Sequence, residues 1–429
     1  MIQAIRAQWA AVSVAIGCAV LAQPAFGQSG PAASPPQWPQ WLQEAMQQET
    51  PKLRSSKVKF GDGAIRTRMA GKLTDKPQQT EGGWYVGSNI GTEAPLECWV
   101  FDDVVDPAGM ATSLADLNLQ AMEQVYGPVQ DRGIYHIDAG AFDGTPYVAL
   151  EWLYSVGEAE EKRIGLVKVR VAVEHELSYA CMHNSLGYRA TFATAFEQFV
   201  REARFPVPAE SPYYEEVLVQ RIAGSAIGIS RSTFTLDSDG DTKIVTLQSS
   251  LLPVDNANLQ SSDTWQVVYS RPDGTLINQT LAKSENGELT MQLSLDPEGG
   301  DLWFVSGTLQ GKEFEREVAA TARPMSELGQ MLAVRALIAD PDELLATLTI
   351  WAPEADPTRF LDAVVELDAM ARGEGRGVLR LGALAIAAQF EPSGSMLAGA
   401  MQVGSAEITM ERVWANGSLP PNEHVAQRD

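Results

Sequence analysis

The segment STFTLDSDGDTKIVTLQSS, residues 232–250, sets the character of the second half of this 429-residue chain. Polar and apolar residues alternate on both sides of its Asp-Gly pair, a pattern typical of two antiparallel strands joined by a tight turn. Residues 264–281, 287–309 and 311–320 continue the pattern, with turns marked by Asp-Gly, Asn-Gly and Gly-Gly pairs. The sequence therefore predicts a β-meander of about six or seven strands.

A helical insert is expected after the meander, at residues 324–372. Both MSELGQMLAVRALIAD (325–340) and PTRFLDAVVELDAMARG (357–373) suggest helices. Residues 377–390, 396–404 and 405–414 then return to strand-like runs. We expect a β-rich domain over residues 214–420, followed by a disordered tail at 421–429 because chain ends are rarely tied down.

The first half mixes helices and strands without regular alternation. Residues 39–50, 110–127 and 188–205 indicate helices, and the remaining segments indicate strands, including a hairpin at 52–74 that turns at Gly-Asp-Gly. We expect a sandwich-like domain over residues 38–205 and a Pro-rich linker at 206–213. The predicted fold class is α+β: an N-terminal antiparallel sheet with packed helices, then a β-rich antiparallel domain with a helical insert.

The first 27 residues have the composition of an export signal. Arg6 precedes the charge-free run AAVSVAIGCAVLA, and AFG before Gln28 has the small residues of a cleavage site. We predict a signal peptide at 1–27, a flexible leader at 28–37, and a periplasmic or secreted protein. Lipid anchoring through Cys18 is the less favoured alternative. No later segment has the length and apolarity of a membrane-spanning helix.

Export also decides how the cysteines are interpreted. Cys18 leaves with the signal, so Cys98 and Cys181 remain, and in an oxidising compartment they most simply form a disulfide. The segment VEHELSYACMHN, residues 173–184, places His175 and His183 near the second cysteine, but Tyr179 stands where the HExxH zinc motif needs its second histidine. We predict no catalytic residue, no metal ligand and no cofactor, with thiol or metal chemistry at Cys181 and His183 as the alternative.

Charge is unevenly distributed along the chain. It carries a net charge of −23, yet residues 52–76 hold eight basic residues against two acidic ones: Lys52, Arg54, Lys57, Lys59, Arg66, Arg68, Lys72 and Lys76. Four of them, Lys57, Lys59, Arg66 and Arg68, would face one another across the hairpin, which is costly unless an anion lies between them. We predict that these four bind an unknown acidic protein or an envelope polyanion, and not nucleic acid. The alternative is a hairpin paired with the protein's own acidic surface.

Residues 167–205 combine a strand that carries aromatic residues, a helix with a phenylalanine stripe, and a short terminal strand. Tyr179, Phe192, Phe196 and Phe205 mark this order, and the helix at 110–126 precedes it. In these features residues 40–205 resemble the PsbP/Mog1-like α/β/α sandwich proteins. The resemblance implies an accessory or binding module, and no catalytic residue carries over from that family. The second half resembles no family that we can name.

These observations favour an exported, non-catalytic binding or accessory protein of a bacterial-type envelope, with the basic hairpin as its contact surface. A hydrolase that uses carboxylates in a cleft between the domains is one alternative. A structural component of an envelope complex is the other.

Overall fold

The computed structural model describes residues 39–50, 52–103, 105–158, 162–174, 177–204, 211–340, 342–404 and 406–419. Contacts divide the chain into two compact units. The N-terminal unit holds Gln23–Ala209 with Leu251–Ser261, and the C-terminal unit holds Glu210–Ser250 with Ser262–Asp429. The predicted signal peptide with Cys18, the leader, most of the linker and the tail lie outside the described residues. Within the described residues, no helix is long and apolar enough to cross a membrane.

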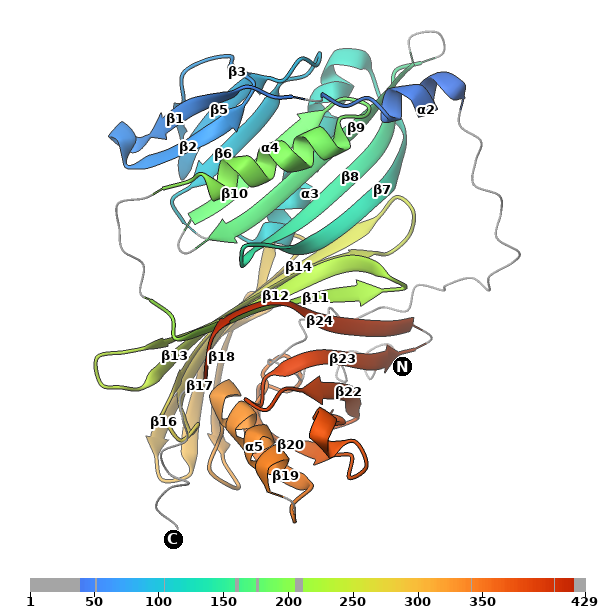
Figure 1. Cartoon of the computed structure of the whole chain (residues 1–429). Helices are drawn as coiled ribbons and strands as arrows, with labels where there is room; N and C mark the ends of the chain where they lie inside the picture. The colour runs from blue at the N-terminus through green and yellow to red at the C-terminus, as the bar shows by residue number, and fades with distance from the viewer. Residues whose placement is uncertain are drawn as a thin grey trace. The chain divides into compact units, whose positions relative to one another are not determined.

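An eight-stranded antiparallel sheet forms the centre of the N-terminal unit (Figure 1). Its order is β3-β5-β6-β10-β9-β8-β7, and β4 pairs with β5 outside that path. The strands are β3 (Lys72–Leu73), β4 (Gln78–Thr80), β5 (Gly83–Asn89), β6 (Leu96–Phe101), β7 (Val129–Phe142), β8 (Thr145–Val156), β9 (Arg163–Glu174) and β10 (Leu177–Asn184). Residues on both faces of β8, β9 and β10 are buried, so this part of the sheet is covered from two sides.

Two helices supply much of that cover. Figure 1 shows α4 (Arg189–Arg201) in front of β9 and β10, and α3 (Pro107–Tyr126) behind them. The stripe of Phe192, Phe196 and Phe199 on α4 is fully buried, as the helical spacing predicts. A hairpin of β1 (Ser55–Phe60) and β2 (Ile65–Ala70) packs on α4, and the short helix α2 (Gln40–Met46) packs against β9 through Leu42 and Leu166.

The C-terminal unit is built on one antiparallel sheet of fourteen strands. Its order is β18-β17-β16-β15-β14-β13-β12-β11-β24-β23-β22-β21-β20-β19. The strands are β11 (Tyr214–Ile222), β12 (Ser225–Leu236), β13 (Thr242–Pro253), β14 (Leu259–Ser270), β15 (Leu276–Glu285), β16 (Glu288–Gly299), β17 (Leu302–Leu309), β18 (Lys312–Ala319), β19 (Leu345–Trp351), β20 (Phe360–Leu367), β21 (Arg376–Leu381), β22 (Leu384–Phe390), β23 (Met396–Val403) and β24 (Ala406–Gly417). The meander expected over residues 232–320 has seven strands, β12–β18, in agreement with the prediction, and β11 precedes it.

Helix α5 (Glu327–Ala339) lies against β19 and β20 in this unit. It begins at the N-cap Ser326, whose hydroxyl accepts a hydrogen bond from the Gly329 amide. The turn between β22 and β23 approaches the helix so closely that a Cβ atom on Gly394 would lie 1.9 Å from the carbonyl oxygen of Met331. Gly394 also has φ +93°, so both its conformation and its surroundings require glycine.

The α+β fold class predicted from the sequence is wrong, because strands dominate throughout. They make up 58% of the described structure and helices 16%, and only four α-helices occur among the described residues. The prediction gave each helix the same weight as each strand. It overlooked that β7, β8 and β9 extend over 12 to 14 residues, so that the N-terminal unit is itself mostly sheet.

Half of the predicted helical insert is also strand. Residues 325–340 contain α5, as expected, but residues 357–373 contain β20 and no α-helix. Ala363, Val365 and Leu367 are buried while Asp362 and Glu366 are exposed, which is the two-residue period of a strand. The spacing of the apolar residues in this segment fits both periods, and pairing with β19 and β21 decides between them.

Candidate binding surface and buried carboxyl network

The hairpin β1–β2 brings together the four basic residues that the sequence indicates. In its register Lys57 lies opposite Arg68, and Lys59 lies opposite Arg66. All four side chains are exposed, while the alternate residues of each strand are mostly buried. The hairpin therefore presents its cations on one face, in two adjacent pairs. We call this face, with its flanking residues Lys52, Arg54, Lys72 and Lys76, the basic hairpin surface.

The opposite face of the hairpin is fixed to the core. Phe60 meets Phe199 of α4 edge to face with 6.4 Å between ring centroids, and Met69 is fully buried in the same cluster. The buried hydroxyl of Thr67 donates a hydrogen bond to the carbonyl of Phe199. Because these contacts hold the backbone, the cations project from a surface whose shape is set before any partner binds.

None of the eight basic residues of the basic hairpin surface forms an ion pair with another described residue. All eight are exposed, and the side chain of Arg66 donates a hydrogen bond to the carbonyl of Gly63, at 3.2 Å. Basic residues elsewhere differ: Arg189 pairs with Glu151 at 2.5 Å, and Arg231 pairs with Glu215 at 2.8 Å. Among the described residues, no acidic side chain is thus paired with the cations of the hairpin.

The two cysteines face each other across β6 and β10. Cys98 and Cys181 are partners in the strand register, both are fully buried, and their Sγ atoms lie 2.07 Å apart, the distance of a disulfide. His183 is also fully buried; its Nε2 lies 3.0 Å from the Thr92 hydroxyl, and burial lowers its pKa to about 3. His175 lies outside the described residues. Within the described residues no group of three or more metal-binding side chains occurs.

A row of titratable residues on neighbouring strands was not identified from the sequence. Lys168 of β9 lies between Glu151 of β8 and His183 of β10 in the strand register. Its side chain is fully buried, its ammonium donates to the Ser185 carbonyl at 2.5 Å, and burial lowers its pKa to about 7. A lysine in the run LVKVRVAV looks like a solvent-facing strand position. It is buried here because helices cover both faces of β9.

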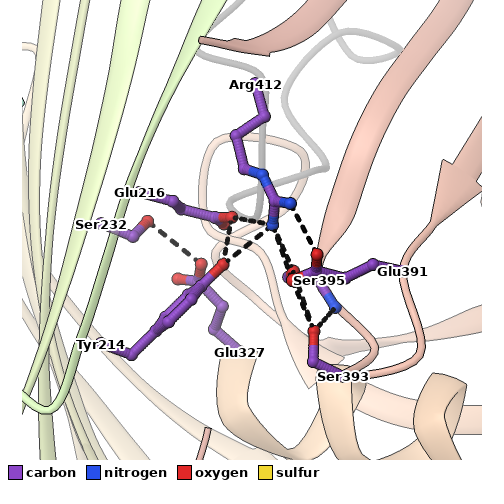
Figure 2. A network of polar contacts seen from close by, with 8 residues as sticks. All are labelled: Tyr214, Glu216, Ser232, Glu327, Glu391, Ser393, Ser395 and Arg412. Carbon is purple, nitrogen blue, oxygen red and sulfur yellow. Dashed lines mark hydrogen bonds and ion pairs between the residues drawn. The ribbon is translucent and has the colours of Figure 1, made fainter. Parts of the chain in front are cut away.

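The C-terminal unit contains a second polar row, inside its sheet (Figure 2). Glu216 of β11, Ser232 of β12 and Thr246 of β13 are successive partners in register, and all three are buried. Glu327, the first residue of α5, accepts hydrogen bonds from the Ser232 hydroxyl at 3.1 Å and the Thr246 hydroxyl at 3.2 Å. The amino end of α5 is thereby joined to two strands, β12 and β13, through a buried carboxyl group.

Arg412 of β24 stands at the centre of the network. It donates two hydrogen bonds to Glu391, at 2.9 and 2.7 Å, and one to the Ser395 hydroxyl at 2.6 Å. Its Nη1 also donates to the Tyr214 hydroxyl at 3.2 Å, but it lies 3.7 Å from the nearest oxygen of Glu216. The guanidinium group therefore binds Glu391 through two short hydrogen bonds, and it forms a longer ion pair with Glu216 (Figure 2).

The three carboxyl groups titrate in different ranges because their surroundings differ. Hydrogen bonds from Arg412 lower the pKa of Glu391 to about 2. Burial raises the pKa of Glu216 to about 7 and that of Glu327 to about 8, and the charge of Glu216 adds to the rise at Glu327. Near neutral pH the network thus holds the Arg412–Glu391 ion pair, a Glu216 carboxyl group that is partly protonated, and a Glu327 carboxyl group that is mostly protonated.

Glu216 also lines a pocket in the interior of this unit. The other lining residues are Gln330, Met331 and Val334 of α5, Val365, Leu379, Phe390 and Met396 of β20 to β23, and Gly394. The space that a water-sized group can occupy is about 30 Å³. That is enough for about two water molecules.

These carboxylates could not be singled out by sequence analysis, because the chain has 55 acidic residues. One local signal was available. The segment YEEVLVQ places two adjacent glutamates in a mostly apolar strand, where neighbouring side chains point to opposite faces. In the structure every residue of this segment is buried. Acidic residues next to one another in an otherwise apolar strand therefore indicate at least one buried carboxyl group.

No known family profile matches the chain, and no curated protein matches it. Two solved structures show low similarity. A β-barrel-like protein of the domain of unknown function DUF1849 from Brucella abortus is 11% identical, with a TM-score of 0.36 over 48% of this chain and 97% of that one. The cyanobacterial PsbP of Synechocystis is 11% identical, with a TM-score of 0.25 over 35% of this chain and 92% of that one. The likeness to PsbP is distant, and the resemblance of residues 40–205 to that family stays a prediction.

Proposed function

We propose that this protein is a non-catalytic binding protein of the cell envelope, which captures an anionic partner on the basic hairpin surface. One observation carries the proposal: four exposed basic residues lie on one face of the hairpin, and neither they nor the four exposed basic residues that flank them in sequence form an ion pair with a described residue, in a chain of net charge −23. An acidic protein segment and an envelope polyanion both have the required charge.

The geometry of the hairpin favours such a partner. Alternate residues on a strand lie about 7 Å apart and partners across the strands about 5 Å apart. Like charges at these distances repel by roughly 1 kcal/mol per pair in water, and an anion placed between them removes that cost. Binding through several such contacts should therefore be strong at low salt and weaken as the ionic strength rises.

A location outside the cytoplasm is part of the proposal. The disulfide-distance pair Cys98 and Cys181 supports it, because such bonds persist mainly in oxidising compartments. The predicted signal peptide points the same way. The carboxylate hydrolase and the structural component stay alternative predictions.

Replacing Lys57, Lys59, Arg66 and Arg68 together by glutamine is expected to reduce binding to a polyanion at least a hundredfold. Each lost contact contributes on the order of 1 kcal/mol, and the four act on one partner. Retention on immobilised heparin and on polyglutamate, measured by surface plasmon resonance at several salt concentrations, checks the prediction. The slope of log affinity against log salt concentration should fall together with the affinity.

A charge-matched control variant distinguishes the effect of the hairpin residues on binding from the effect of the change in net charge. Glutamine at the exposed residues Lys312, Arg316, Arg376 and Arg380 also changes the net charge by four, from −23 to −27. This variant should bind within threefold of the unaltered protein. Equal losses in the two variants, or wild-type binding by the hairpin variant, would rule the hairpin out as the contact surface.

A further inference from the structure

A further arginine lies beside the hairpin β1–β2, in the segment that follows α4. Arg204 forms an antiparallel pair with Arg66 of β2. The Arg66 amide donates to the Arg204 carbonyl at 3.0 Å, and the Arg204 amide donates to the Arg66 carbonyl at 2.8 Å. On its other side, Arg66 lies opposite Lys59 of β1. Lys59, Arg66 and Arg204 therefore form one row across three neighbouring backbone segments.

The three side chains of this row leave the backbone on the same face. Residues directly opposite each other in antiparallel strands project to one side of the sheet, and the Cα atoms of a hydrogen-bonded pair are about 5.5 Å apart. All three residues are exposed, and none of them forms an ion pair with a described residue. Arg204 thus extends the basic hairpin surface by a cation that sequence analysis did not identify.

Backbone carbonyl groups hold both arginine side chains in place. The Nε atom of Arg66 donates to the Gly63 carbonyl at 3.2 Å. The Nη1 atom of Arg204 donates to the carbonyls of Arg201 and Ala203, at 2.8 and 2.6 Å. These acceptors carry no net charge, so both guanidinium groups keep their positive charge uncompensated. Their orientation is fixed in advance, which reduces the entropy that an anion must overcome when it binds.

A row of two guanidinium groups and one ammonium group is complementary to a phosphate group. A guanidinium group presents its donors as a planar fork that matches two phosphate oxygens. A phosphate monoester carries about two negative charges at pH 7 and three acceptor oxygens, so it can accept from two forks. A carboxylate has one charge and two oxygens, and a single fork occupies both.

We propose that Lys59, Arg66 and Arg204 bind a phosphate monoester group, whose oxygens accept hydrogen bonds from the two arginine side chains and from the lysine. The inference rests on the proposed function, because it names the chemical group by which the anionic partner is recognised. It narrows the partner from any polyanion to one that carries phosphate. A soluble phosphorylated molecule and a lipid headgroup both offer this group.

Phosphorus NMR of glycerol 3-phosphate titrated with the full chain tests the inference, because the signal broadens on binding. The affinity should lie in the millimolar range expected for so small a ligand. Sulfate, a tetrahedral dianion, should displace glycerol 3-phosphate. Succinate, a dianion with two separate carboxylates, should need at least a fivefold higher concentration than sulfate at equal ionic strength. Equal displacement by the two dianions would overturn the proposal.

Substitutions in the row locate the site. Arg204→Gln and Arg66→Gln should each weaken binding of glycerol 3-phosphate at least fivefold. Arg204→Lys keeps the charge but removes the fork, so it should weaken binding at least threefold. Arg359→Gln is the matched control, because this exposed arginine is paired with Asp356 at 2.9 Å, and it should leave binding unchanged. Circular dichroism checks that each variant is folded. Undiminished binding by Arg204→Gln would contradict the proposal.

Vesicles distinguish the two sources of phosphate. Sedimentation with phosphatidylcholine vesicles that contain phosphatidic acid shows whether the protein accepts a lipid headgroup. Binding to these vesicles or to glycerol 3-phosphate, with the loss expected in Arg204→Gln, supports the proposal, and binding to neither overturns it. A protein that binds heparin and polyglutamate without any preference for phosphate would contradict this inference alone. A protein that binds no polyanion would contradict the proposed function as well.

Discussion

Replacing both Cys98 and Cys181 by alanine is expected to lower the free energy of unfolding by about 4–5 kcal/mol, because the bond closes a long loop. The two residues are 83 positions apart in the sequence, and both side chains are fully buried. Without the crosslink the unfolded chain gains conformational entropy. Urea unfolding of the two proteins, followed by circular dichroism, measures the difference.

Reducing agent provides the control for this prediction. When unfolding is measured with excess dithiothreitol, the unaltered protein should approach the stability of the double variant. Val86→Ala removes volume beside the bond, since Val86 is the register partner of Cys98, and its effect should persist in reductant. A double variant as stable as the unaltered protein without reductant would show that the two sulfur atoms are not joined.

Replacing Glu216 and Glu327 together by glutamine is expected to stabilise the protein at pH 9 by roughly 3 kcal/mol or more, and to change its stability little at pH 5. Both carboxyl groups keep their protons to higher pH in the folded than in the unfolded chain, because burial raises the pKa to about 7 and about 8. Their contribution to stability is therefore complete below pH 4.5 and is lost as the pH rises toward 8.

Glutamine has no such dependence, so the double variant should show a flatter profile of stability against pH. Urea unfolding at intervals between pH 5 and pH 9 gives this profile. Glu313→Gln, at an exposed position of β18, is the control, and its profile should parallel that of the unaltered protein. If the double variant were destabilised at pH 9 as much as at pH 5, the carboxyl groups would act only as hydrogen-bond partners of Tyr214, Ser232 and Thr246.

The sequence predicted correctly those elements whose structure depends on residues close together in the chain. The alternation of basic and apolar residues around Gly-Asp-Gly predicts a hairpin at 52–74, and β1 and β2 have the expected faces. The helices at 110–127, 188–205 and 325–340 also occur, because each has a regular apolar stripe or a capping residue. The prediction of an α+β class was wrong because fold class depends on how long the strands are and on how they assemble into sheets.

The amino-acid sequence by itself determined the basic hairpin, the pairing of the two cysteines that remain after the predicted signal, and the strand character of residues 214–320. These features follow from spacing over a few residues, or from elimination. Tertiary structure alone decided that residues 357–373 contain a strand, because pairing with two neighbours outweighs an ambiguous local pattern. It also decided the carboxyl network, since Tyr214 and Arg412 are 198 positions apart and meet only where β11 pairs with β24. The charge state of a buried carboxyl group depends on what surrounds it in space, and the order of residues along the chain does not contain that information.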